Sequence, residues 1–306
     1  MADPILHHYD LSPYAEKIRL CFGLKGVAWR SVQIPSILPK PDLMPLTGGY
    51  RRTPVLQIGA DIYCDTERIA VELERRYPSP TLFPAGGSGL AAIVGNWAAT
   101  SLFMPAVRYA LGVNADKMPL EFHRDRAAMR GAEPNVAAMK AAAPKLHNRL
   151  RAELEWVESL LSDGRAYLLG ERPGLADLSV FHCVWFVRRW GPPVSEALAP
   201  FPRLKAWMER IDRVGHGKRI ELESGAALDI ARQAQSTAAP LADPGDAEGF
   251  LPGDRVSVTS EDTGRDPVTG ELVVLAANEI GLRRRDERVG EVVVHFPRVG
   301  YDLRRV

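Results

Sequence analysis

The sequence predicts an α+β protein made of three blocks, and the pattern of each block supports this. Residues 1–80 alternate short β-type and helical patterns, residues 88–232 are almost entirely helical in pattern, and residues 249–306 are rich in Val, Gly and Arg with hairpin-like turns. The 306 residues can form more than one domain, and 46% hydrophobic and 25% charged residues are ordinary globular values.

The charge balance and the cysteines exclude several classes of protein. With 39 Lys and Arg against 38 Asp and Glu, the formal net charge is +1, which argues against whole-protein binding to nucleic acid or to an acidic membrane. The three cysteines, Cys21, Cys64 and Cys183, are too few for a disulfide scaffold or a zinc ribbon and suggest a reducing compartment. The N-terminus lacks a basic segment followed by a long apolar stretch, so we expect no secretory signal and a cytoplasmic protein.

Residues 1–80 read as a βαβ unit followed by a β-hairpin and a second helix. Ser12 stands where a helix N-cap belongs, Pro13 takes the first helical position, and Gly26 falls where a C-terminal stop is expected. Asp65 and Thr66 open the second helix. Strands are expected over Ile5–Tyr9, Trp29–Ile34, Val55–Ile58 and Ile62–Cys64, and the second helix is expected to run to about Tyr77.

Residues 88–232 contain two notable apolar segments. The segment Tyr77–Val107 has no charged residue and is about long enough to span a bilayer. Because prolines and glycines interrupt it, we expect a linker and then a buried helix from about Leu90, with no membrane span. A helix that is apolar on all sides follows Gly174 and is expected at the centre of a bundle. Gly174 has no side-chain acceptor, but Asp177 can reach back to the backbone N–H at the helix start.

The C-terminal block differs in composition from the rest. Residues 233–250 are polar and rich in Pro, Ala and Gly, which predicts a flexible linker. Residues 245–306 hold nine arginines, no lysine and twelve acidic residues, a poor match for nucleic-acid phosphates, and Arg283–Arg285 is expected at a solvated strand end. A small SH3-like β-barrel over residues 249–306 is predicted from β pattern at Arg255–Thr259, Glu271–Ala276, Glu279–Arg283 and Glu291–Phe296.

Four short motifs follow one another along the first 220 residues. They are Ser12-Pro13-Tyr14-Ala15-Glu16-Lys17-Ile18-Arg19-Leu20, Thr53-Pro54-Val55-Leu56, Asp65-Thr66 at a helix start, and Gly170-Glu171-Arg172-Pro173-Gly174-Leu175-Ala176-Asp177. In this order and spacing the motifs resemble the cytosolic glutathione transferase superfamily over about residues 4–220. The resemblance implies a thioredoxin-like glutathione-binding domain over residues 1–80 and an all-α domain over residues 88–232, and it leaves residues 249–306 unmatched.

Ser12 would carry the chemistry that this resemblance implies. A thiol with a pKa near 8.5 is mostly protonated at pH 7, whereas the thiolate is the nucleophile. A hydroxyl donor and the positive end of a helix both stabilise a bound glutathione thiolate, and Ser12 is placed to offer both. The alternative is that Ser12 only caps the helix. Because the helix start has no Cys-x-x-Cys, dithiol–disulfide exchange is disfavoured.

Further contacts with glutathione, the expected co-substrate, follow from the resemblance. Thr53 precedes Pro54, where the family has a cis-proline, and its N–H and C=O would pair with the cysteinyl backbone. Asp65 would bind the γ-glutamyl ammonium and Thr66 the γ-glutamyl carboxylate, although the pair is also a plain N-cap. Candidates for the glycyl carboxylate, any of which could equally be solvated, are Lys40, Arg51 and Arg52.

The pocket for the electrophile is expected between the two domains. Candidates from that region are Tyr14, Phe103, Met104, Arg108 and Tyr109, which could instead be core or dimer contacts. His7 and His8 are neighbours on a strand and point to opposite faces, so we do not expect them to form a metal pair. No other metal-ligand spacing is present in the sequence.

Two functions from different classes remain open. The first is a glutathione-dependent transferase that delivers the thiolate to a small apolar electrophile. The second is a non-catalytic module of the same fold whose C-terminal β segment docks a partner. A homodimer is expected from the family, and the uncharged helix over Leu90–Val107 would suit burial at a subunit or domain interface. Neither nucleic acid nor a membrane is expected as a partner.

Overall fold

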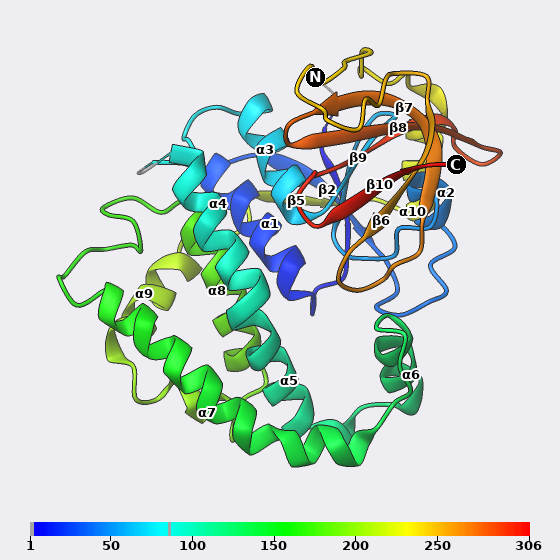
Figure 1. Cartoon of the computed structure of the whole chain (residues 1–306). Helices are drawn as coiled ribbons and strands as arrows, with labels where there is room; N and C mark the ends of the chain where they lie inside the picture. Colours follow the sequence, from blue (N-terminus) through cyan, green and yellow to red (C-terminus); the bar gives the residue numbers. More distant parts are fainter. Residues whose placement is uncertain (1–2, 85–86) are drawn as a thin grey trace.

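A computed structural model describes residues 3–84 and 87–306 (Figure 1). One large sheet lies at one end of the molecule, the helices α4–α9 form the other end, and α1 lies between them. The first block contains β1 (Ile5–His8), α1 (Pro13–Lys25), β2 (Ala28–Gln33), α2 (Met44–Thr47), β3 (Val55–Ile58), β4 (Asp61–Cys64) and α3 (Thr66–Arg76). The second contains α4 (Gly87–Trp97), η1 (Ala98–Leu102), α5 (Phe103–Val113), η2 (Ala115–Lys117), α6 (Leu120–Ala128), α7 (Val136–Leu160), α8 (Leu175–Arg189), η3 (Val194–Leu198) and α9 (Pro202–Asp212). The third contains β5 (Lys218–Glu221), α10 (Ser224–Gln233), β6 (Arg255–Ser260), β7 (Val268–Ala276), β8 (Glu279–Asp286), β9 (Gly290–Phe296) and β10 (Tyr301–Arg305).

The C-terminal strands continue the N-terminal sheet. The ten strands run in the order β10-β6-β7-β8-β9-β4-β3-β1-β2-β5, and β9 pairs in parallel with β4 through Asp61, Ile62 and Tyr63. The sheet is therefore open, and the expected closed SH3-like barrel is not formed. An edge strand presents unpaired N–H and C=O groups, and here β9 satisfies the free edge of β4.

The segment expected to be a flexible linker is bound to the sheet. Asp61 of β4 accepts hydrogen bonds from the Thr237 hydroxyl at 2.7 Å and from the Thr237 backbone N–H at 3.0 Å. Further along, Leu241 forms a β-bridge with Val274 of β7. The C-terminal strands thus belong to the same sheet as the strands of residues 1–80, and the segment that leads to them is bound to that sheet. The division of the chain into three domains stays a prediction.

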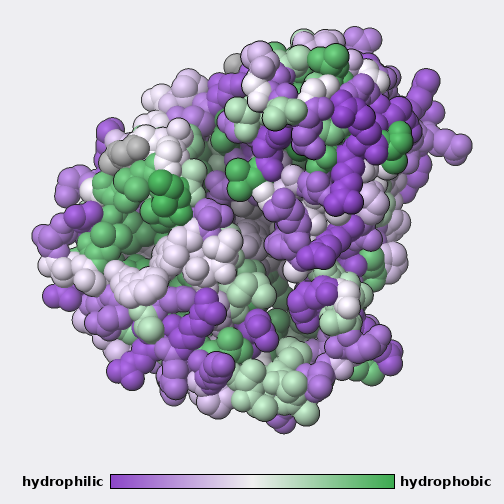
Figure 2. Space-filling view, in the orientation of Figure 1, coloured by the Kyte–Doolittle hydropathy of each residue, from purple (hydrophilic) through white to green (hydrophobic). Residues whose placement is uncertain are grey.

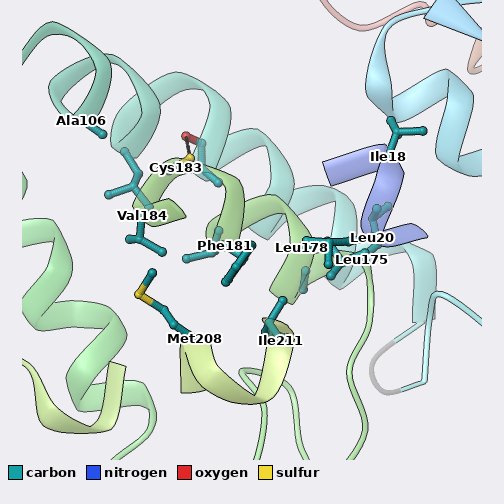
Figure 3. Close-up of a cluster of buried hydrophobic side chains, with 14 of the residues drawn as sticks. Ile18, Leu20, Ala106, Leu175, Leu178, Phe181, Cys183, Val184, Met208 and Ile211 are labelled. Atoms are coloured by element: carbon teal, nitrogen blue, oxygen red, sulfur yellow. Dashed lines mark hydrogen bonds between the residues drawn. The ribbon is translucent and has the colours of Figure 1, made fainter. Parts of the chain in front are cut away.

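Two hydrophobic cores hold the molecule together. The first surrounds α8, whose buried side chains meet Ala106 of α5 and Ile211 of α9, with Ile18 of α1 beside its start (Figure 3). The predicted central apolar helix is therefore confirmed. Each fully buried large apolar side chain contributes about 1.5–3 kcal/mol of transfer free energy. The second core joins strands of the first block to β6–β10, so the C-terminal strands are also held by apolar packing.

The start of α8 is capped as the sequence predicted. Asp177 accepts a hydrogen bond from the backbone N–H of Gly174 at 3.0 Å, and its other oxygen accepts from the N–H of Leu168 and the indole N–H of Trp207, each at 2.8 Å. A side chain at Gly174 would collide with Pro84, since a Cβ built there lies 2.6 Å from its ring. Gly174 therefore allows close packing, and Asp177 supplies the missing cap.

The long apolar segment Gly87–Val113 could cross a membrane by its length and composition. In this structure it is the helical run α4–η1–α5, which packs against α7 and α8. Part of its surface stays uncovered, and Figure 2 shows a hydrophobic patch on that side of the molecule. The helical run lies in the bundle, but the expectation of a buried helix from about Leu90 is met only in part, because Leu90 and Ile93 of α4 are exposed.

Candidate functional site

Ser12 lies at the N-terminal tip of α1 in extended backbone conformation. Its Oγ accepts a hydrogen bond from the backbone N–H of Ala15 at 3.2 Å, which caps the helix. Ser12 is 2% exposed. Among residues 3–84 and 87–306 its hydroxyl donates to no acceptor. Since a hydroxyl can accept and donate at once, the cap leaves the Ser12 proton available to a bound sulfur.

Thr53 presents an unused backbone pair near the start of β3. Its N–H and C=O make no hydrogen bond to any other residue that the structure describes, while its Oγ1 accepts from Lys40 Nζ at 2.9 Å. The Thr53–Pro54 peptide bond is cis, as the resemblance implied. A free N–H and C=O on one residue can pair with an extended peptide, which is the contact expected for the cysteinyl unit of glutathione.

Asp65 and Thr66 lie at the start of α3, directly after β4. Because Cys64 of β4 pairs with Val55 of β3, they follow the strand that lies next to Thr53–Pro54. Asp65 caps the helix through a 3.0 Å hydrogen bond from the backbone N–H of Glu67, and it has a positive φ of 73°. Burial raises the pKa of the Asp65 carboxyl, partly offset by that N–H. Thr66 Oγ1 accepts from Lys17 Nζ at 3.3 Å. Asp65 is thus the cap and Thr66 a partner of Lys17, and their role as ligands of a γ-glutamyl group stays a prediction.

The three candidate cations are bound to the protein itself. Lys40 is buried, and its Nζ donates to the Arg51 carbonyl at 2.8 Å and to Thr53 Oγ1 at 2.9 Å. Burial lowers the pKa of Lys40 to about 7, and the neighbouring charges of Arg126 and Arg51 act in the same direction. Arg51 pairs with Asp125, which ties the first block to α6. Of the three side chains, that of Lys40 is the one that hydrogen-bonds to Thr53 among the described residues.

Arg52 faces the C-terminal block. Its Nε donates to the Thr263 carbonyl at 2.9 Å, and its terminal nitrogen contacts the Asp262 carboxylate and the Ser260 hydroxyl. On the other side of the site, the Tyr301 hydroxyl donates to Asp65 Oδ2 at 3.1 Å. Sequence reasoning missed Asp262 and Tyr301, because they lie in the block that resembles nothing in the family and carry no local motif.

The electrophile candidates separate into two groups. The Tyr14 ring lies 4.6 Å from the Phe103 ring and 4.7 Å from the His182 ring, measured between centroids. Burial raises the pKa of the Tyr14 hydroxyl well above its ordinary value. His182 of α8 was not predicted, since a lone histidine in an apolar helix gives no signal.

Tyr109 does not join this aromatic group. It is 8% exposed, packs 5.2 Å from the His147 ring, and lines a separate cavity of about 510 Å³ between α5 and α7. Its role in the electrophile pocket stays a prediction, and the structure places it apart from Tyr14 and Phe103. On the same helix as Phe103, Met104 is partly buried and Arg108 is exposed, and their role in that pocket remains a prediction.

His7, His8 and the three cysteines are buried side chains outside this site. His7 bonds to Gln57 and His8 to Ser31, and burial lowers the pKa of His7 to about 4 and that of His8 to about 3. Burial raises the pKa of Cys21 to about 12. Within the described part of the chain, no three His, Cys, Asp or Glu side chains are grouped to hold a metal ion.

Comparisons with known proteins match two parts of this chain to known domains. The model of the glutathione S-transferase N-terminal domain matches residues 6–81, and that of the C-terminal domain matches residues 134–210. A solved GST-like protein from Pseudomonas syringae is 40% identical, covers 100% of both chains and superposes with a TM-score of 0.78. The chain belongs to the glutathione transferase superfamily. This shows that the thioredoxin-like and helical parts of the fold were predicted correctly.

More distant transferases share the fold over 69% of this chain. A theta class glutathione S-transferase from Xanthomonas axonopodis pv. citri, solved with glutathione bound, is 19% identical over 69% of this chain and 92% of its own, with a TM-score of 0.51. Poplar glutathione transferase F1 is 12% identical over 69% of this chain and 93% of its own, with a TM-score of 0.55. None of the curated proteins compared with this chain matches it. The match to the Pseudomonas syringae relative covers this chain completely and so includes the C-terminal strands.

Proposed function

We propose that the chain is a glutathione-dependent transferase in which Ser12 stabilises the thiolate of bound glutathione. The observation that carries this proposal is the Ser12 hydroxyl, which caps α1 through its oxygen and keeps its proton free at the positive end of the helix. A hydrogen bond from that hydroxyl favours the charged form of the sulfur and so lowers the thiol pKa.

The other predicted contacts would orient the tripeptide. The free N–H and C=O of Thr53 would pair with its cysteinyl unit, and the candidates Lys40, which bonds to Thr53, and Arg52, which precedes Thr53 in the chain, would face its glycyl carboxylate. Asp65 and Thr66 at the start of α3 would bind its γ-glutamyl end. Held in this way, the sulfur would lie near Ser12 at the tip of α1.

The reaction then needs an apolar electrophile. The thiol proton passes to solvent, the sulfur forms a bond to the electrophilic carbon, and the leaving group departs with the electrons of its bond. The tilted rings of Tyr14 and Phe103, with His182 behind them, offer an apolar wall at the start of α1 for a small substrate. The buried, unpaired thiols fit the predicted cytoplasmic location.

A second function has a specific observation in its favour. Asp65 and Arg52, which are predicted to bind the two ends of glutathione, are both hydrogen-bonded to the C-terminal block. A transferase fold that has lost catalysis and uses this block to dock a partner would show the same contacts. The two functions differ in whether glutathione binds and reacts.

The test is conjugation of glutathione to a small aryl halide, measured over a wide range of glutathione concentration. We expect turnover by the wild-type chain and a loss of about 10²- to 10³-fold in Ser12→Ala, the cost of removing one hydrogen bond to a developing anion. Ser12→Gly separates the two roles of the residue, because Gly at an N-cap costs only a few tenths of a kcal/mol. Turnover that is unchanged in both variants contradicts the proposal.

A further inference from the structure

The C-terminal block contacts the predicted glutathione site at its acidic end. Tyr301 of β10 is 7% exposed, and its hydroxyl donates to Asp65 Oδ2 at 3.1 Å and lies 3.2 Å from the Tyr50 hydroxyl. Asp65 Oδ1 is already used by the helix cap. The oxygen that would receive the ammonium group of a γ-glutamyl unit is therefore occupied by a hydroxyl donor from the chain itself.

The same block contacts the site at its basic end. Arg52 donates to the Thr263 carbonyl and contacts the Asp262 carboxylate, both in the 260–264 loop, which begins at the last residue of β6. A carboxylate on Arg52 is the contact that the glycyl end of glutathione would make. Tyr301 and Asp262 thus offer a donor and a carboxylate to the same two residues that were predicted to bind the two charged ends of the tripeptide.

The 260–264 loop also bridges to the helical block. The backbone N–H of Gly264 donates to the Met129 carbonyl after α6 at 2.8 Å. Gly264 has a positive φ of 63°, and a Cβ there would lie 3.4 Å from Met129 and within 3.7 Å of Arg51 and Arg52. The loop therefore lies against both the first and the second block, where glutathione and its electrophile would have to meet.

We propose that β10 and the 260–264 loop form an autoinhibitory cover whose Tyr301 and Asp262 take the places of the two charged ends of glutathione. This inference rests on the proposed function. The cover and the tripeptide exclude each other, so glutathione binds only to molecules in which the cover has moved. The apparent affinity then equals the intrinsic affinity multiplied by the fraction of open molecules.

The position of the cover in the fold makes a local opening feasible. β10 is five residues long and pairs only with β6, at the edge of the described sheet. By contrast, β7, β8 and β9 are each paired on both sides. Edge strands open at a lower free-energy cost than strands at the centre of a sheet.

The test is calorimetric titration of glutathione into the full-length wild type, Tyr301→Phe and Asp262→Asn. Tyr301→Phe keeps the buried ring and removes the donor to Asp65, and Asp262→Asn removes the charge facing Arg52 from an exposed side chain. Both changes weaken the closed form and leave the predicted glutathione contacts intact. We expect each variant to bind glutathione about tenfold more tightly or better, which is the usual worth of a hydrogen bond to a charged group.

Asp302→Asn is the matched control. Asp302 neighbours Tyr301 on β10, is partly exposed, and pairs with Arg304, so this variant should bind glutathione like the wild type. Hydrogen exchange gives a second readout, since glutathione should raise exchange in β10 and in the 260–264 loop. Equal glutathione affinity in the wild type and both variants, or unchanged exchange, overturns the cover and leaves the proposed function standing. Absence of glutathione binding in all of them at millimolar concentration overturns the cover and the proposed function together.

Discussion

At Ser12, a structural role and a chemical role fall on one oxygen. The cap uses a lone pair of Oγ and the proposed thiolate contact uses its proton, so the two do not compete. Asp65 shows the opposite situation, because its carboxylate oxygens can serve either the closed chain or a ligand. Catalysis can therefore be built into a helix cap, whereas glutathione binding depends on which partner the buried carboxylate has.

His295 of β9 holds the C-terminal strands to β4 through buried charges. Its Nδ1 lies 2.8 Å from Glu279 of β8, and its Nε2 lies 3.5 Å from Asp61 of β4. Beyond these carboxylates, Arg68 of α3 pairs with both Glu279 and Glu72. Burial by itself would lower the pKa of His295, but the two flanking carboxylates outweigh it and raise the pKa.

This raised pKa predicts that the protein loses stability as the solution becomes alkaline. The stabilisation from His295 is complete below its unfolded pKa of about 6.5 and is lost as the pH rises through its higher folded pKa. In His295→Gln we expect this pH dependence to disappear, with a loss of about 1–3 kcal/mol at pH 6 because buried carboxylates lose a partner. Chemical denaturation between pH 6 and about pH 9 checks it. Identical pH profiles for the variant and the wild type would show that His295 stays neutral.

At the scale of elements, α4 and α7 leave an apolar face uncovered (Figure 2). Ile93 of α4 is 69% exposed and Trp156 of α7 is 60% exposed, and the Trp156 ring packs 6.1 Å from that of Trp97. Leu90 and Leu160 are also exposed on these helices. Contiguous exposed apolar side chains mark interaction surfaces, so this face suits the homodimer that the family leads us to expect.

A charge on this face should prevent the dimer. We expect the wild type to sediment as a dimer at micromolar concentration and Ile93→Glu to sediment as a monomer, since burying an unpaired carboxylate in an apolar interface is costly. Val299→Glu is the control, because Val299 is 79% exposed and lies in the C-terminal block. A monomeric wild type, or a dimer that survives Ile93→Glu, would argue against this face as the interface.

At the scale of the whole molecule, the features that could be predicted are those formed by residues close together in the sequence. The caps at Ser12, Asp65 and Asp177 each bond to a group two to nine residues away, so the local pattern contains both partners. The family motifs then placed two of the three blocks in space. The strand β5 is polar and exposed, and β10 alternates apolar and polar residues only over Tyr301–Arg304, so both were missed as strands.

The cover over the site could not be predicted for the same reason. Tyr301 and Asp65 are 236 residues apart, and Asp262 and Arg52 are 210 residues apart. Their meeting depends on the pairing of β9 with β4, which four short β segments and a polar connection do not specify. The sequence therefore led us to expect a separate barrel, whereas the folded chain turns the same strands onto the site.

The most direct test of the central claim is the pKa of the glutathione thiol when it is bound. Thiolate absorbance is followed against pH with glutathione bound to Tyr301→Phe, the variant with the weakened cover, and to the double variant that also carries Ser12→Ala. We predict a midpoint at least about one unit below the value of about 8.5 for a free thiol, and a return to that value without the Ser12 hydroxyl. A midpoint equal to that of free glutathione, or one that Ser12→Ala leaves unchanged, would contradict the account.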